Sequence, residues 1–96
     1  MHKLDNNAID RLFEAILSLE NKEECYSFFE DVCTIQELGS IAQRLEVAKL
    51  LYEGKSYIEI NKLTGASTAT ICRVGKCVNY GSGGYKTAID RLDKKE

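Results

Sequence analysis

The 96-residue sequence contains no proline and one histidine, and its apolar residues never form a long uninterrupted run. A membrane-spanning helix needs roughly 18 or more apolar residues in succession, so we expect no membrane span. No basic and then apolar leader opens the chain, and we expect no signal peptide. The apolar residues recur at helical spacings, and no proline interrupts them, which predicts an all-α protein. The length is that of a single domain, over residues 1–96.

Few residues are suited to catalysis or metal binding. The histidine is His2, at the chain end, and the cysteines Cys25, Cys33, Cys72 and Cys77 include no C-x2-C pair. A nucleophilic cysteine needs a nearby base, and a zinc site needs closely spaced ligands. We therefore expect no enzymatic activity, no metal, no cofactor and free thiols, which are typical of a cytoplasmic protein.

Charge is divided unevenly along the chain. Residues 1–40 contain three basic and nine acidic residues, a net charge of −6, whereas residues 41–96 contain ten basic and six acidic residues, a net charge of +4. Within residues 54–87 five basic residues accompany one acid, Glu59. A concentrated positive field favours nucleic acid, so the overall charge of −2 does not exclude DNA binding.

Residues 56–80 have the pattern of a helix-turn-helix. Ser56, followed three residues later by Glu59, forms a capping box, so a helix should begin directly after Ser56. Gly65 stands where that helix should end in a left-handed conformation, and Ser67 can cap a second helix. Two short helices joined by a short turn containing glycine are typical of DNA-binding domains.

Both helices should turn apolar side chains inward, at spacings of three and four residues. These are Ile60 and Leu63 in the first helix and Ile71, Val74 and Val78 in the second. Asn61 is a departure, since motifs of this kind favour a small residue at that position.

The start and outward face of the second helix suit DNA, and we call them the reading head. It comprises Ser67, Thr68, Ala69, Thr70, Arg73 and Lys76. We expect Lys76 to hold phosphate together with Lys55 and Lys62, and the other five residues to approach bases. A helix N-terminus also attracts phosphate. The alternative is a solvated helix that only completes a bundle, because helical hairpins are common in all-α domains.

Residues 1–53 should form three helices that serve dimerisation. Residues 8–19 carry an apolar stripe, and capping boxes at 21–24 and 34–37 should begin the next two helices. The third extends to about residue 53 with apolar residues on more than one stripe, which predicts burial on two sides. So much apolar surface in so short a chain predicts a homodimer.

A glycine-rich break at 79–84 should separate the helix-turn-helix from a last helix at 85–93. Ala88, Ile89 and Leu92 should face inward there, which brings the total to about six helices.

Several segments resemble the Trp-repressor superfamily in order and spacing. They are AQRLEVAKLL (42–51), LLYEGKSYIEI (50–60) and ASTATICRV (66–74). TIQEL, GASTATI and NYGSGGY make the chain most similar to the small Trp-repressor-like proteins of the YerC/YecD type, over roughly residues 32–92. The resemblance implies an intertwined homodimer that binds operator DNA and regulates transcription. Each dimer would present two reading heads to successive major grooves.

The resemblance also implies a candidate effector pocket at Gln43, Arg73 and Cys77. In the tryptophan-responsive repressor, the indole lies between two arginine planes, and here Arg73 matches one while Gln43 replaces the other. Val74 replaces a small glycine, and Cys77 replaces a serine that meets the amino group. We therefore expect tryptophan not to be the corepressor, and any effector is unknown. The alternative function is a dimeric protein-interaction module of the same fold without operator binding.

Overall fold

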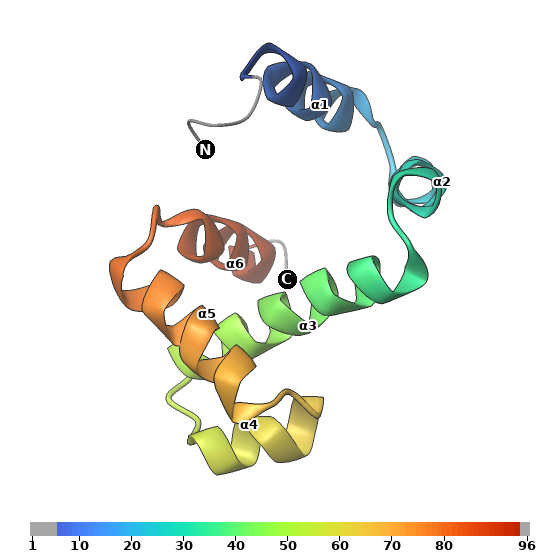
Figure 1. The fold of residues 1–96 in the computed structure, drawn as a ribbon. Coiled ribbons are helices and arrows are strands. Elements are labelled where there is room, and N and C mark those ends of the chain that lie inside the picture. Colours follow the sequence, from blue (N-terminus) through green and yellow to red (C-terminus); the bar gives the residue numbers. More distant parts are fainter. Residues whose placement is uncertain (1–5, 95–96) are drawn as a thin grey trace. The chain divides into compact units, whose positions relative to one another are not determined.

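The structure, a computed structural model, describes residues 6–94, which form six helices and no strand. The helices are α1 (Asn6–Ser18), α2 (Lys22–Val32), α3 (Ile35–Tyr52), α4 (Tyr57–Thr64), α5 (Thr68–Tyr80) and α6 (Gly84–Lys94) (Figure 1). The predicted all-α class is confirmed, and α6 begins one residue earlier than expected. The chain divides into two compact units, Met1–Leu38 (unit 1) and Gly39–Glu96 (unit 2).

Side-chain caps begin the helices that follow α1. The Asn21 side chain accepts a hydrogen bond from the Glu24 N–H at 2.8 Å. Thr34 Oγ1 accepts from the Glu37 N–H at 3.0 Å, and the Glu37 carboxylate accepts from the Thr34 N–H at 2.8 Å. Both predicted helix starts are therefore confirmed, since these bonds satisfy N–H groups that a helix leaves without partners.

Unit 1 has no buried residue among those the structure describes. Phe13 is 52% exposed and Leu17 84%, although both lie on the apolar stripe of α1. The Phe28 and Phe29 rings of α2 meet edge to face, with centroids 5.3 Å apart. The helices of unit 1 therefore carry core-like apolar faces that this unit does not bury within itself.

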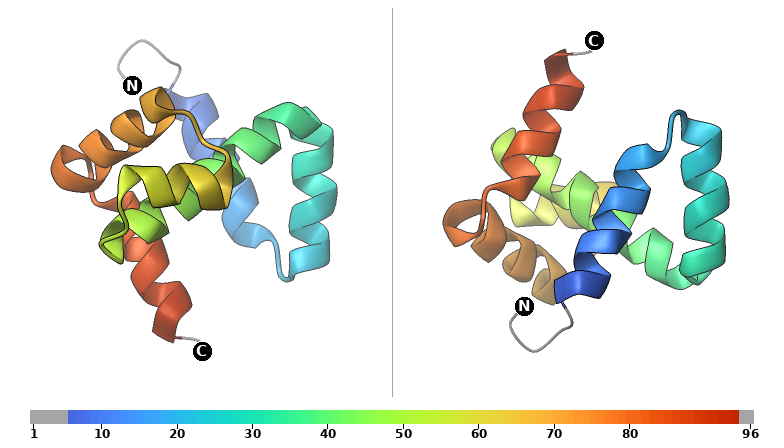
Figure 2. Two further views of the ribbon diagram at one scale, coloured as in Figure 1. Left: turned by 90° about the horizontal axis from the view of Figure 1, so that it is seen from below. Right: turned by 90° about the horizontal axis from the view of Figure 1, so that it is seen from above.

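Unit 2 has one core, to which α3, α4, α5 and α6 all contribute. Its buried members are Val47, Ala48, Ile60, Ala66, Ile71, Val74 and Ile89. Figures 1 and 2 show α4, α5 and α6 grouped around the C-terminal half of α3. The predicted inward positions of Ile60, Ile71, Val74 and Ile89 are confirmed, and this shared core fixes α5 against the rest of the unit.

Three residues predicted to face inward are exposed. Leu63 is 65% and Leu92 52% exposed, and Ala88 is exposed as well. Helix α4 has only eight residues and buries Ile60 alone, so its face toward the core is too narrow to include Leu63. Likewise, Ile89 is the one buried residue of α6.

Among the residues that the structure describes, α3 is not buried on two sides as expected. Only Val47 and Ala48 are buried in this helix, whereas Ile41 is 50% exposed and Ile35 90%. Within unit 2 the core covers one side of α3, and Ile41 is not part of that core.

Candidate DNA-binding site

The first helix of the helix-turn-helix is bounded as the sequence predicts. The Ser56 side chain accepts from the Glu59 N–H at 3.2 Å, and the Glu59 carboxylate accepts from the Ser56 N–H at 3.3 Å. At the other end Gly65 has φ 75° and ψ 2°, and its N–H donates to the Asn61 carbonyl at 2.8 Å. This left-handed residue reverses the chain within a short turn, which glycine permits at little cost.

The N-terminus of α5 is capped by Ser67, whose side chain accepts from the Thr70 N–H at 3.2 Å. The Ser67 hydroxyl also donates to the Thr70 hydroxyl at 3.2 Å, and Thr70 is half-buried. The Thr70 side chain therefore takes part in the cap, whereas the sequence suggested only a contact with bases.

Helix α5 presents one polar and basic face outward. Ala69, Arg73 and Lys76 are spaced by four and three residues, so they share one side of the helix, and all three are exposed. Ile71 and Val74 occupy the opposite side in the core. The outward face is thus the side of α5 that the unit leaves free.

Gly75 of α5 lies close to the side chain of Tyr57 on α4. A Cβ placed on Gly75 would lie 3.2 Å from the Tyr57 hydroxyl, which is closer than most Cβ contacts, so the Tyr57 side chain would have to shift slightly. Gly75 is buried, so Tyr57 of α4 can lie against the backbone of α5. No local pattern in the sequence distinguishes Gly75 from other helical positions.

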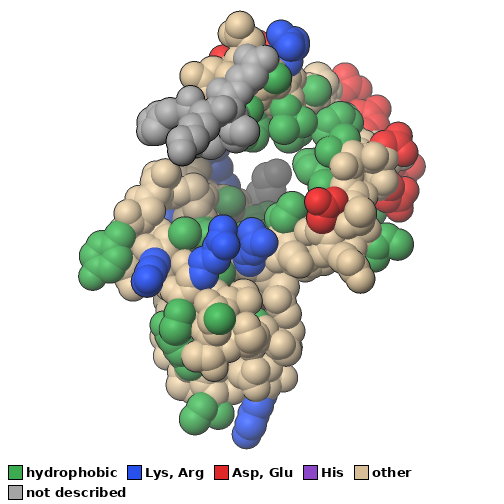
Figure 3. Space-filling model, viewed as in Figure 1, with side chains coloured by type: hydrophobic (Ala, Val, Ile, Leu, Met, Phe, Trp, Pro, Cys, Tyr) green, Lys and Arg blue, Asp and Glu red, His purple; other side chains and the backbone are tan. Residues whose placement is uncertain are grey.

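The other predicted DNA-binding residues are all accessible. They are Lys55, Lys62, Ser67, Thr68, Ala69, Arg73 and Lys76. Figure 3 shows Lys and Arg side chains gathered where α5 lies, and Asp and Glu side chains gathered over α2 and the neighbouring end of α1. The charge division read from the sequence is thus carried by separate parts of the chain.

Lys86, on α6, is engaged within the unit. Its Nζ lies 2.9 Å from Asp90 Oδ2, one turn along the same helix. The hydrogen bond from Lys86 to Asp90, together with the attraction of that carboxylate, raises the pKa of Lys86 above its ordinary value. The neighbouring carboxylate makes Lys86 a weaker candidate for a phosphate contact than the lysines near α4 and α5.

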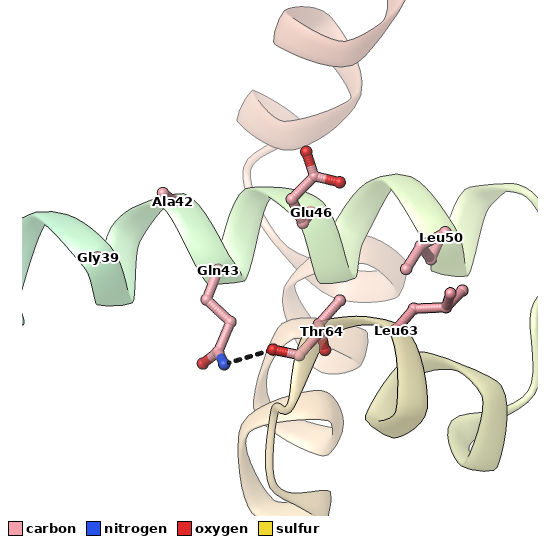
Figure 4. A pocket seen from close by; sticks show the side chains of 7 residues that line it. All are labelled: Gly39, Ala42, Gln43, Glu46, Leu50, Leu63 and Thr64. Carbon is pink, nitrogen blue, oxygen red and sulfur yellow. Dashed lines mark hydrogen bonds between the residues drawn. The ribbon is translucent and has the colours of Figure 1, made fainter.

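The three residues of the candidate effector pocket do not line one common hollow. Gln43 lines a groove between α3 and the end of α4, together with Ala42, Glu46, Leu50, Leu63 and Thr64 (Figure 4). Cys77 lines a second hollow beside Tyr85 and the glycine-rich turn at 81–84. Arg73 is exposed on the outward face of α5.

Two side-chain amides hold the turn between α4 and α5. The sequence pattern did not assign either of them to the helix-turn-helix. Gln43 Nε2 donates to the Thr64 carbonyl at 3.1 Å, and Asn61 Nδ2 donates to the Ala66 carbonyl at 2.8 Å. The Ala66 N–H donates to the Thr64 hydroxyl at 3.1 Å, and this hydroxyl donates to the Ile60 carbonyl at 2.7 Å. The only local indication of these hydrogen bonds in the sequence was Asn61, an amide at a position where a small residue is usual.

Other chemistry is limited in the part of the chain that the structure describes. The four cysteines are free, with Cys25 and Cys33 half-buried and Cys72 and Cys77 exposed. Among residues 6–94, no three side chains of the metal-binding types lie close enough to hold an ion. None of the described helices is both long and apolar enough to cross a membrane.

Comparison with known proteins identifies the family. A family model described as Trp repressor protein matches residues 7–93. The chain belongs to the Trp repressor family. This family is one of regulatory DNA-binding proteins and not of enzymes, as the sequence analysis expected for this chain.

Individual proteins are similar to this chain over nearly its whole length. The uncharacterised protein YerC of Bacillus subtilis (strain 168) is 55% identical over 94 residues, covering 98% of this chain and 90% of that protein. A crystal structure of a candidate Trp repressor from Staphylococcus aureus has a TM-score of 0.91 at 49% identity, covering 96% of this chain and 92% of its own. The crystal structure of a TrpR-like protein from Eubacterium eligens ATCC 27750 has a TM-score of 0.92 at 53% identity, covering 97% and 96%.

Proposed function

We propose that this member of the Trp repressor family is a sequence-specific transcriptional regulator that binds operator DNA as a homodimer. The observation that carries the proposal is the placement of α5. Its Ile71 and Val74 side lies in the core, and its Arg73 and Lys76 side is exposed. A helix held in this way can enter a major groove without disturbing the fold. Since such a regulator acts on the chromosome, we place it in the cytoplasm.

The residues of the reading head divide by chemistry. Arg73 has a planar fork of donors that matches the acceptors of a guanine edge, and Ala69 offers a methyl group to thymine. Lys76, one turn after Arg73 on the same face, has a single charged group that suits phosphate. Lys55 precedes α4 and Lys62 lies in its last turn, and both are exposed, so they can hold the DNA backbone.

Unpartnered apolar surface supports the homodimer. Unit 1 buries none of its described residues, and Leu17, Ile35 and Ile41 are 84%, 90% and 50% exposed. Soluble monomers rarely leave this much apolar side-chain surface open to water. A second copy of the chain would cover it, and a twofold axis would then place two reading heads about 34 Å apart, one turn of DNA.

The rival function is a protein-interaction module that keeps the fold and the dimer but not the operator. Exposed apolar faces of α1 and α2 would serve such a module equally well. The basic outward face of α5 favours the regulator, because an interaction module has no need of Arg73 and Lys76 on a helix that suits a groove.

Selection of bound duplexes from a random pool, followed by salt titrations, tests the proposal. The wild type should select a site with two related half-sites about one helical turn apart. Arg73→Ala should lose about 1–3 kcal/mol for each half-site on the selected duplex and should relax specificity. Lys76→Ala should weaken the selected and scrambled duplexes alike and reduce the salt slope by roughly one ion for each reading head.

Lys22→Ala is the matched control, because Lys22 is exposed on α2 in the acidic unit and its loss removes the same charge. It should leave the specificity and the salt slope close to wild type. If no sequence is selected, or if Arg73→Ala and Lys76→Ala behave like Lys22→Ala on both duplexes, the interaction module becomes the better account.

A further inference from the structure

The carbonyl groups at the C-terminal end of α4 need partners from elsewhere. The last four carbonyls of a helix have no partner within it. In α4 the Asn61 carbonyl accepts from the Gly65 N–H, and the Thr64 carbonyl accepts from Gln43 Nε2 at 3.1 Å. The second bond is supplied by another helix, 21 residues earlier in the chain. Gln43 therefore caps α4 from the side of α3.

The hydrogen bond from Gln43 joins α3 to the end of α4. These two helices must keep a fixed relative position if α5 is to bind DNA. Gln43 lies in α3, which contributes Val47 and Ala48 to the core, and Thr64 directly precedes the turn into α5. Figure 4 shows the Gln43 side chain reaching from α3 to the end of α4. The bond is partly buried, so water competes with it less than at an open surface.

Other polar groups of the turn also have partners within the chain. Asn61 Nδ2 donates to the Ala66 carbonyl at 2.8 Å, and the Ala66 N–H donates to the Thr64 hydroxyl at 3.1 Å. Gly65 supplies the reversal, and Ser67 caps α5. No bound molecule is needed to complete this set, because each of these groups already has a partner within unit 2.

We propose that Gln43 is a positioning residue that docks the turn of the helix-turn-helix onto α3 through the Thr64 carbonyl, so that the reading head binds its operator without any small-molecule effector. The role rests on the proposed function. When the turn is already ordered in the free protein, DNA binding requires no further free energy to order it. Loss of the amide should free the turn, and the cost of ordering it should then reduce operator affinity.

The test compares three substitutions with the wild type in the full chain. Gln43→Met keeps a long unbranched neutral side chain but has no N–H to donate, and Gln43→Lys restores a donor. Gln36→Met is the matched control, since Gln36 is exposed in the first turn of the same helix. All proteins are unfolded in guanidinium, dialysed and refolded, so that any bound small molecule is removed. Affinities are measured on the selected operator and on a scrambled duplex.

The wild type, freed of small molecules, should keep its preference for the operator. Gln43→Met should lose about two- to tenfold in operator affinity for each half-site, with little change on the scrambled duplex. Gln43→Lys should recover the ratio of operator to scrambled affinity, and Gln36→Met should match the wild type. Hydrogen exchange at the Gly65 and Ala66 amides should rise in Gln43→Met alone, while light scattering reports an unchanged mass.

Two results would overturn the proposal while leaving the proposed function intact. One is a Gln43→Met protein with the wild-type ratio of affinities and unchanged exchange at the turn. The other is a refolded wild type that prefers the operator only after the removed small-molecule fraction is returned. A wild type with no preference for any duplex, even with that fraction returned, would instead remove the proposed function.

Discussion

Replacing Gly65 by alanine should destabilise the protein, although the same replacement at Gly39 should not. Gly65 has φ 75°, in the left-handed region that L side chains rarely adopt. A Cβ built on Gly65 meets no other atom within 4 Å, so no steric clash adds to the cost. The whole effect should therefore be backbone strain in the turn that leads into α5.

The magnitude follows from two opposing contributions. The left-handed conformation costs an alanine roughly 1–2 kcal/mol. Alanine also lowers the conformational entropy of the unfolded chain, which stabilises the folded protein by about 0.4–1 kcal/mol. The net loss should be about 1 kcal/mol, which lowers the Tm of a domain of this size by roughly 4–8 °C. Gly65→Asn should lose less, because asparagine enters the left-handed region more readily.

Gly39 provides the control because it lies inside α3 and a Cβ built on it also meets nothing within 4 Å. With regular helical geometry there, Gly39→Ala should gain roughly 0.5–1 kcal/mol. Thermal unfolding followed by circular dichroism at one protein concentration measures both variants. Equal gains at the two positions would refute a left-handed turn at Gly65. A loss at Gly39 would indicate that another surface packs against Gly39, which lines the groove between α3 and the end of α4.

Three further outcomes are expected. Light scattering at micromolar concentration should give about twice the chain mass of 10.8 kDa, because one chain leaves too much apolar surface open, and a monodisperse monomer would exclude the intertwined fold. Calorimetry with millimolar tryptophan should show no saturable heat, since Gln43 cannot stack on an indole as a guanidinium does, and a micromolar Kd would contradict this. Ile60→Ala should cost about 2–5 kcal/mol, because Ile60 is fully buried, whereas Ile58→Ala, at a side chain 72% exposed, should cost far less. Equal losses at the two isoleucines would mean that α4 faces another way.

Helix boundaries in this protein follow from local sequence. Capping at Ser56 and Ser67 and the reversal at Gly65 depend on bonds between residues at most four positions apart. The side chain and the backbone group that it satisfies are then neighbours in any chain that begins a helix there. The same argument explains why Ile60, Ile71 and Val74 could be assigned to the core from their spacing, and why Ala69, Arg73 and Lys76 could be placed on the exposed side of α5.

The sequence by itself therefore determined which segments are helical, where the helix-turn-helix begins and turns, and which side of α5 is polar and basic. Tertiary structure alone decided that Leu63 lies exposed beside the groove, that Tyr57 rests against Gly75, and that Gln43 reaches Thr64. These outcomes depend on the distance and angle between whole helices. Residues far apart in the chain meet only after those helices have packed, and no pattern of spacing within a single helix contains that information.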